Sequence, residues 1–270
     1  MQKNIYYYNN DYSKPITLII NKITNNVSVS SSYWLDDYGE INNDEIIFNI
    51  LGKCNINDNY IKFNDNNYWH KDLRKNLLFI GANDMQEINY YVNNYKNGLF
   101  IEAIDYTYER LKKNLSNTII YNTNYIAIND LVSSKKNIEY IFNIFNNSEG
   151  SSSIYEPNIE KWAWPDVIIK EKKKLISNTI EDILKKNNWE EYIYDVVLDV
   201  QGAELEVLKG FGINNLKNIK TLTVEISSEK FYIGGVLFNE LNDYLINNNF
   251  ILYSNPNSSH CDVIYTSTIL

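Results

Sequence analysis

The order of apolar and polar positions along the chain changes character near residue 70. Before that point, short apolar runs alternate with turns of Asn, Asp and Gly, as in PITLIINKITNNVSVSSSYW, EIIFNILGKCNI and NYIKFNDNNYW. Runs of this length between turn residues are typical of β-strands. We therefore expect residues 1–70 to form a small β-rich module and residues 71–270 to form a second domain.

In the second part, apolar strand patterns alternate with helical patterns. One such unit is NLLFIGANDMQEINYYVNNYKNG, where an apolar run ends at Gly81 and the pair Asp84 and Glu87 has the spacing of a capping box. Apolar positions at helical spacing follow this box. Near the end of the chain, FNELNDYLINN predicts a helix, and FILYS and DVIYTS predict a β-hairpin. The alternation favours an α/β domain with a parallel sheet covered by helices.

Composition and charge narrow the class of protein. The 270 residues are 44% hydrophobic and 22% charged, which is ordinary for a globular chain with a sizeable core. The formal net charge is −9 and the main basic run is Lys172–Lys174, so we expect no nucleic-acid partner. Cys54 and Cys261 lack the spacing of a zinc site, and no apolar stretch has the length of a membrane span. We expect a soluble, cytoplasmic protein without a membrane partner.

An acid stands at the junction of a strand and a helix in LDVQGAELEVLKGFG, residues 198–212. A charge is costly to bury unpaired, so Asp199 at the end of an apolar run indicates that something is bound or activated there. A cap for the following helix is the alternative. Glu225, in LTVEISS, is a second acid on an apolar strand. The two acids could bind hydroxyl groups, share a divalent cation, or divide base and orienting roles.

Two further features point to a nucleoside-like ligand. The turn at Gly81 before a helix start favours an anion, although a plain strand-to-helix turn fits it as well. Glu102 interrupts the apolar strand Leu99–Ile104 about 20 residues later, where nucleoside-binding α/β folds place an acid on the ribose hydroxyls. A water-facing position at a sheet edge is the alternative for Glu102.

Several other side chains are candidates for the same cleft. His260 precedes the last strand, in a loop that could overhang the site, and a neutral imidazole can act as a base. Glu204 lies just inside a helix, where a negative charge suits the helix dipole. By composition alone, the serine triplet 151–153 is a flexible loop. Tyr155 and Trp164 offer aromatic surface that suits a sugar ring or the packing of a core.

The chain resembles a known family in five segments. These segments are FIGAND, IEAIDYTYERLKKNL, EGSSSIYEP, YDVVLDVQGAELEVLKG and TVEISSEKFYIGG, and their order and spacing resemble the FkbM family of S-adenosylmethionine-dependent O-methyltransferases. The resemblance extends over roughly residues 75–265. It implies a doubly wound, Rossmann-like class I methyltransferase sheet with an antiparallel last strand. It also implies methyl transfer from S-adenosylmethionine to a hydroxyl of a small molecule, sugar or glycan.

The resemblance also assigns roles to individual residues. The position of Asp199 at the end of its strand allows it to act as general base, as partner of the sulfonium or as ligand of an assisting cation, and Glu225 and His260 are further catalytic candidates by their positions. The expected cofactor contacts are Gly81, Ala82 and Asn83 for the methionine part, Glu102 for the ribose, and Asn129 and Asp130 for the adenine. The expected acceptor contacts are Ser151, Ser152, Ser153 and Glu204.

The sequence departs from the family at two positions. Members usually carry an acid where Phe79 stands and a second glycine where Met85 stands, so the cofactor loop is bulkier here. One alternative is therefore a non-catalytic glycan- or nucleoside-binding protein with a degenerate cofactor loop. A nicotinamide-dependent oxidoreductase is less favoured, because the chain lacks the G-x-G-x-x-G pattern.

Overall fold

The computed structural model divides into two compact units, residues 1–75 with 90–94 and residues 76–89 with 95–270. The residues that the structure describes are 2–8, 15–21, 26–31, 34–42, 45–48, 52–56, 60–64, 67–71, 76–85, 88, 91, 95, 97–117 and 124–270.

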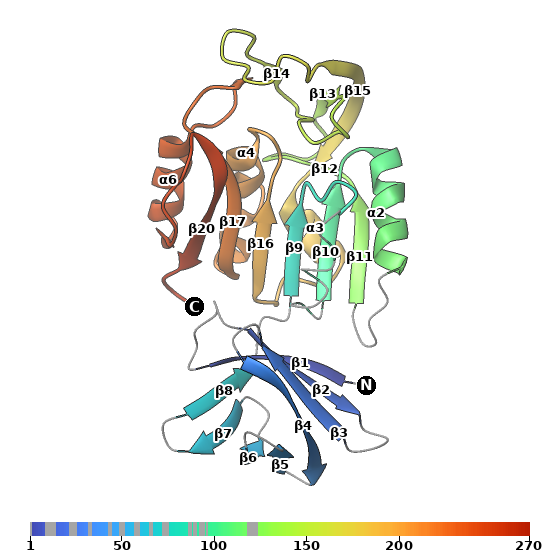
Figure 1. Cartoon of the computed structure of the whole chain (residues 1–270). Coiled ribbons are helices and arrows are strands. Elements are labelled where there is room, and N and C mark those ends of the chain that lie inside the picture. Colours follow the sequence, from blue (N-terminus) through green and yellow to red (C-terminus); the bar gives the residue numbers. More distant parts are fainter. Residues whose placement is uncertain are drawn as a thin grey trace. The chain divides into compact units, whose positions relative to one another are not determined.

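In its described residues, the first unit is a closed antiparallel β-barrel (Figure 1). Its strands are β1 (Gln2–Tyr8), β2 (Pro15–Asn21), β3 (Asn26–Ser31), β4 (Trp34–Asn42), β5 (Glu45–Phe48), β6 (Gly52–Ile56), β7 (Tyr60–Asn64) and β8 (Asn67–Lys71). The pairing of β1 with β8 closes the barrel. The β-rich nature of the module is confirmed. Its first strand lies in a stretch that is polar in sequence, where Tyr and Ile favour extended backbone.

In the described part of the second unit, seven strands form the sheet that carries the site (Figure 1). Their order is β11-β10-β9-β16-β17-β20-β19. The strand β20 pairs antiparallel with both β17 and β19, and the other neighbours are parallel. The predicted α/β class and antiparallel last strand are confirmed. The bounds are β9 (Asn76–Ile80), β10 (Asn97–Glu102), β11 (Asn124–Asn129), β16 (Tyr194–Leu198), β17 (Ile219–Ser227), β19 (Phe250–Leu252) and β20 (His260–Ser267).

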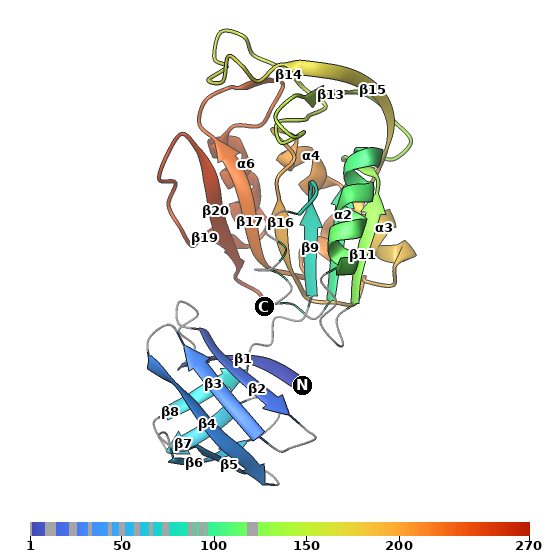
Figure 2. The same ribbon diagram turned by 45° about the vertical axis from the view of Figure 1, so that its right-hand side comes forward.

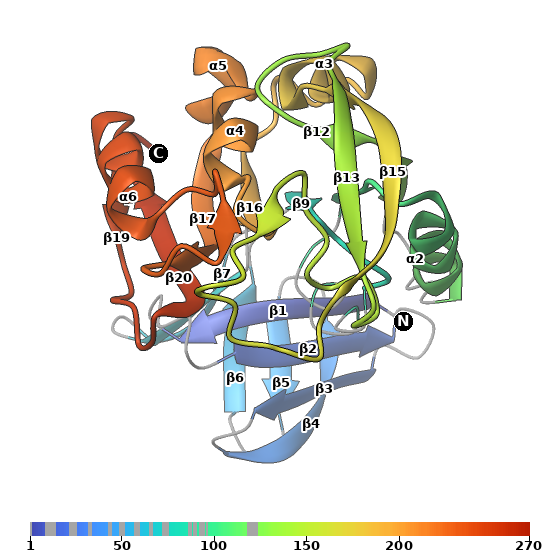
Figure 3. The ribbon, with the colours of Figure 1, turned by 90° about the horizontal axis from the view of Figure 1, so that it is seen from above.

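Helices cover this sheet as right-handed crossovers require. The described helices are α2 (Asp105–Asn117), α3 (Ile180–Lys186), α4 (Glu204–Lys209), α5 (Gly212–Leu216) and α6 (Phe238–Asn247). Figure 3 shows α3, α4, α5 and α6 together on one side of the sheet. The helix α2 connects β10 to β11 and packs against both strands. Most of the helix predicted after Asp84, together with Glu87, lies outside the described residues.

Further strands lie beyond the carboxyl ends of the central strands (Figure 2). A three-stranded sheet consists of β12 (Leu131–Val132), β15 (Ile169–Asn178) and β13 (Glu139–Phe145). A two-stranded ribbon pairs β14 (Glu156–Pro157) with β18 (Tyr232–Ile233). The sequence patterns do not predict these strands, of which β12 and β13 contribute Leu131, Val132 and Phe142 to the pocket described below.

The core of the second unit explains its near-continuous apolar strands. Leu78, Leu99, Val196 and Leu198 are fully or almost fully buried between the helices on the two faces of the sheet. Burial of each such side chain contributes roughly 1.5–3 kcal/mol. Among the described residues, no helix has the length and apolarity to cross a membrane.

Candidate functional site

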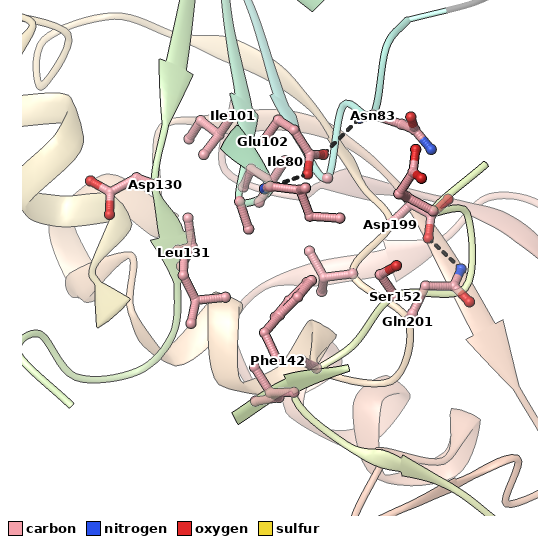
Figure 4. Close-up of a pocket in the computed structure, with 18 of the residues that line it drawn as sticks. Ile80, Asn83, Ile101, Glu102, Asp130, Leu131, Phe142, Ser152, Asp199 and Gln201 are labelled. Atoms are coloured by element: carbon pink, nitrogen blue, oxygen red, sulfur yellow. Dashed lines mark hydrogen bonds between the residues drawn. The ribbon is translucent and has the colours of Figure 1, made fainter. Parts of the chain in front are cut away.

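The main pocket lies where the direction of the crossovers changes. The chain proceeds from β9 to β10 and β11 on one side, and from β16 to β17 on the other, so the switch point lies between β9 and β16. The pocket has about 720 Å³ of empty space, which includes open solvent at its mouth. Its lining includes Gly81, Asn83, Glu102, Asp130, Leu131, Phe142, Glu149, Gly150, Ser152, Asp199 and Gln201 (Figure 4).

Gly81 allows β9 and β16 to approach closely at the floor of this pocket. Its φ is +81°, and a Cβ at this position would lie 1.7 Å from the backbone oxygen of Asp199. The Asp199 N–H donates to the backbone oxygen of Ile80 at 3.1 Å, which joins the two strand ends. The predicted turn at Gly81 is therefore set by strand packing as well as by any ligand.

Glu102, at the end of β10, is buried at the edge of the pocket. Its Oε2 accepts the N–H of Asn83 at 3.0 Å and its Oε1 accepts the N–H of Ile104 at 2.8 Å (Figure 4). Burial raises the pKa of Glu102 to about 7, although these backbone donors oppose the change. A carboxylate has about four lone-pair sites, so Glu102 keeps acceptor capacity for two hydroxyl groups.

The backbone amides of the turn after β9 have acceptors within the protein. The N–H groups of Gly81 and Ala82 donate to the backbone oxygen of Ile101, and that of Asn83 donates to Glu102. The expected use of this turn as a cradle of N–H groups for an anion is therefore not supported. Gly81 and Asn83 line the pocket, while Ala82 is buried and is absent from the lining.

The two departures from the family pattern lie away from the pocket lining. Phe79 stacks on Phe100 with ring centroids 6.4 Å apart. Met85 is buried and has a φ of +59°, the left-handed conformation that a glycine adopts readily. The lining includes neither side chain, so neither narrows the pocket directly.

The expected adenine contacts have different positions. Asn129 is exposed, and its Nδ2 donates to the backbone oxygens of Glu102 and Ala103. Asp130 contributes to the pocket wall, but its carboxylate accepts from Asn178 and points away from the centre in Figure 4. Burial raises the pKa of Asp130 above its usual value.

Asp199 and Glu225 come together through one side chain, that of Gln201. The Nε2 of Gln201 donates to Asp199 Oδ1 at 2.7 Å and to Glu225 Oε2 at 2.5 Å. Asp199 follows β16 directly and Glu225 lies on β17, so the predicted convergence of these acids agrees with the geometry. The Asp199 carboxylate does not cap α4, whose first residue has no side-chain cap.

Burial raises the pKa values of these acids. Burial, followed by repulsion from Glu225, raises the pKa of Asp199 well above its usual value. Burial and repulsion from Glu204 raise the pKa of Glu225 to about 8. Burial raises the pKa of Glu204 to about 7. Near neutral pH the cluster therefore holds protons that exposed acids would have lost.

His260 is the first residue of β20 and not part of an overhanging loop, which corrects that detail of the prediction. Its Nε2 lies 3.2 Å from Glu225 Oε1, and its Nδ1 lies 2.7 Å from the Ser227 hydroxyl. A neutral imidazole satisfies both contacts, because one ring nitrogen donates and the other accepts. His260 therefore orients Glu225, and its ring nitrogens are both engaged.

The expected acceptor residues mostly support the walls. Glu204 is buried, and its Oε1 accepts the N–H groups of Val200 and Gly202, which fixes the turn after Asp199. Ser153 is buried and donates to the backbone oxygen of Gln201 at 2.7 Å. The Ser152 hydroxyl accepts the N–H of Phe145, and the Ser151 hydroxyl accepts from Asn147. Of these four residues, Ser152 lines the main pocket.

An ion-pair cluster that the sequence patterns do not indicate anchors the wall that contains Gly150. Glu149 is buried, and its carboxylate contacts Arg110 of α2 and Lys170 of β15. Arg110 also lies 3.5 Å from Asp84. The cluster joins four parts of the chain, and Glu149 among them lines the pocket. The spacing of these residues in sequence gives no signal of the contact.

No group of three or more His, Cys, Asp or Glu side chains within the described residues has the arrangement of a metal site. The Nε2 of Gln201 occupies the position between Asp199 and Glu225 that a shared cation would take. A divalent cation bridging these two acids does not fit this geometry.

Comparison with known proteins connects this site to a family. A model of the methyltransferase FkbM domain matches residues 47–252. The chain belongs to the FkbM methyltransferase family. The family resemblance is thereby confirmed, and with it S-adenosylmethionine as the cofactor that this family uses. No curated protein shows significant sequence similarity to this FkbM-family chain.

Solved structures show more distant likenesses. An FkbM methyltransferase from Methylobacillus flagellatus KT has 11% identity and a TM-score of 0.43, over 71% of this chain and 43% of that one. M. capricolum TrmK with S-adenosyl-homocysteine has 12% identity and a TM-score of 0.40, over 73% and 64%. Magnesium protoporphyrin IX methyltransferase from Synechocystis PCC 6803 has 7% identity and a TM-score of 0.39, over 71% and 69%. The FkbM-family chain thus spans less than two thirds of the first two structures.

Proposed function

We propose that this protein transfers a methyl group from S-adenosylmethionine to a hydroxyl of a sugar or glycan. The observation that carries the proposal is the position of Glu102 and Asp199, which line one pocket at the switch point of the sheet. In this proposal Glu102 holds the ribose and Asp199 faces the reactive methyl group. Family membership supports the reaction class.

The pocket has the chemistry that the cofactor needs. Ile80, Ile101 and Leu131 provide apolar walls for the adenine, and Glu102 accepts the ribose hydroxyls. S-adenosylmethionine supplies an electrophilic methyl group on a sulfonium. Asp199 lines the same pocket, where its carboxylate would face that sulfonium.

Asp199 is the proposed base for the acceptor hydroxyl. Burial and repulsion from Glu225 raise its pKa, which suits a group that takes a proton during the reaction. The bond from the hydroxyl oxygen to the methyl carbon forms as the carbon–sulfur bond breaks, and Asp199 takes the hydroxyl proton. Positioning of the two reactants supplies much of the remaining rate.

A second hollow beside Glu225 is the proposed place for the rest of the acceptor. Its lining includes Glu225, Ser227, Phe231, Tyr232 and His260, and it has about 310 Å³ of empty space including its mouth. Trp164 is partly exposed next to it and lies 5.1 Å from the Phe231 ring. Aromatic faces beside carboxylates suit a sugar ring, whose apolar face stacks and whose hydroxyls donate.

The test is incubation with methyl-labelled S-adenosylmethionine and a panel of nucleotide sugars and oligosaccharides. We expect label in at least one acceptor with wild-type protein and none with Asp199→Asn. Absence of heat on calorimetric titration with S-adenosylhomocysteine at millimolar concentration would instead support the non-catalytic alternative.

The affinity for S-adenosylhomocysteine should depend on the charge of Glu102. Hydroxyl donors favour the carboxylate, and only about a tenth of Glu102 is ionised one pH unit below a pKa of about 7. We therefore expect the affinity to fall about tenfold between about pH 8 and about pH 6, because the fraction of protein with an ionised Glu102 falls. Calorimetry across this range checks the prediction. The variant Glu102→Gln should bind more weakly and should lack this pH dependence, and an identical profile in both proteins would contradict the assignment.

A further inference from the structure

Gln201 has an unusual backbone for a residue with a long side chain. Its φ is +56°, in the left-handed region that non-glycine residues rarely adopt, and its side chain is buried. Such a conformation is strained and persists only where the surroundings hold it. The Ser153 hydroxyl donates to the Gln201 backbone oxygen, and Glu204 fixes the adjacent N–H groups. These hydrogen bonds therefore hold the backbone in a strained conformation that fixes the position of the Gln201 side chain.

The side-chain amide satisfies two acids at once. A carboxamide carries two N–H donors on one nitrogen, and the Nε2 of Gln201 lies within hydrogen-bond distance of both Asp199 and Glu225. The Oε1 of Gln201 lies 2.8 Å from the Tyr232 hydroxyl, which fixes the orientation of the amide. Few side chains could take this place, because a cationic donor would neutralise the acids and a shorter amide would not reach both.

The surroundings of Asp199 are mostly negative or neutral. The groups that face it are Glu225 on β17, Asp262 on β20, Glu204 at the start of α4 and Tyr232 on β18, with His260 on the far side of Glu225. Asp199 and Glu225 also interact directly, and this contact favours a shared proton over two charges. The donor of Gln201 is the contact that favours an ionised Asp199.

We propose that Gln201 is a positioning residue that favours the ionised form of the Asp199 carboxylate and directs it at the sulfonium by donating its amide to both Asp199 and Glu225. The inference deepens the proposed function and rests on it. It assigns Gln201 no contact with the reacting atoms. Its effect should appear as a preference for the positively charged S-adenosylmethionine over the neutral thioether S-adenosylhomocysteine.

The test compares the affinities for these two ligands by calorimetry across neutral pH. Gln201→Asn is the informative variant, because Asn tolerates the left-handed backbone but its amide is one methylene too short to bridge the acids. We expect both proteins to bind S-adenosylhomocysteine similarly. Near pH 7, the ratio of the affinity for S-adenosylmethionine to the affinity for S-adenosylhomocysteine should be about tenfold lower in the variant than in the wild type. It should regain that preference only at higher pH, because loss of the donor raises the pKa of Asp199.

A second substitution separates this role from general support of the fold. In the double variant Gln201→Asn with Glu225→Gln, the repulsion between the acids is absent, so Asp199 should ionise again and the preference should return. Equal preference and equal pH profile in wild type and Gln201→Asn, with both ligands bound, would overturn the inference alone. Absence of binding of either ligand to the wild type would overturn the proposed function and this inference with it. If Gln201→Asn does not fold, Tyr232→Phe should give a smaller change in the same direction, and an unchanged profile there would also overturn the inference.

Discussion

We expect Asp199→Asn to abolish methyl transfer while the fold and the binding of S-adenosylhomocysteine persist. The substitution keeps the shape of the side chain and its Oδ1 acceptor for Gln201, but it removes the base and the negative charge at the pocket. A general base contributes roughly 10²–10⁴-fold to a rate, so we expect at least a loss of that order. Turnover of an acceptor identified from the panel, measured with labelled cofactor, gives the result.

The matched control is Asp195→Asn, which makes the same change at the other end of the same strand. Asp195 is buried and accepts from Thr221 Oγ1 at 2.5 Å, away from the pocket. We expect a lower melting temperature for this variant and a turnover close to that of the wild type. Undiminished turnover in Asp199→Asn would refute the role of Asp199, whatever the control shows.

Gly81→Ala is expected to prevent stable folding of the second unit. A Cβ at Gly81 would lie 1.7 Å from the Asp199 backbone oxygen, and the φ of +81° disfavours any other residue. Relief of that clash requires separation of β9 from β16 at the centre of the sheet, which disrupts the hydrogen bond from Asp199 N–H to Ile80. The expected result is a loss of several kcal/mol in the free energy of unfolding, which urea denaturation measures.

Gly150→Ala is the control for this prediction. Gly150 also lines the pocket, but the nearest atom to its added Cβ, the Asn147 backbone oxygen, lies 3.4 Å away. We expect its denaturation midpoint to remain within the usual scatter of surface substitutions, about 0.5 kcal/mol. Equal midpoints for Gly81→Ala and wild type would show that the close approach of the two strands is absent in solution.

The sequence contains enough information to predict the acids but not the way they are connected. Asp199 and Glu102 each interrupt or end an apolar run, and such an interruption is visible without a structure. The sequence-based expectation that Glu102 and Asp199 end neighbouring strands is wrong, because β9 lies between β10 and β16. Strand order depends on pairing between distant segments, which local periodicity does not encode.

The contacts of Gln201 and Tyr232 also depend on segments that are distant in sequence, so local patterns do not predict them. Gln201 belongs to a run singled out in sequence for its acid, and its hydrogen bonds reach residues 24 and 31 positions away. A buried polar side chain in a turn gives no sequence signal until its partners are placed. The serine triplet has the composition of a flexible loop, yet Ser152 and Ser153 are buried, because both form hydrogen bonds with the unpredicted strand β13.

A crystal structure of the protein with S-adenosylhomocysteine tests the central claim most directly. We expect both ribose hydroxyls to lie about 2.5–3.2 Å from the Glu102 carboxylate and the sulfur to lie on the side of the pocket formed by Asp199. A ligand bound elsewhere, or a ribose out of reach of Glu102 with its sulfur turned away from Asp199, would contradict the account.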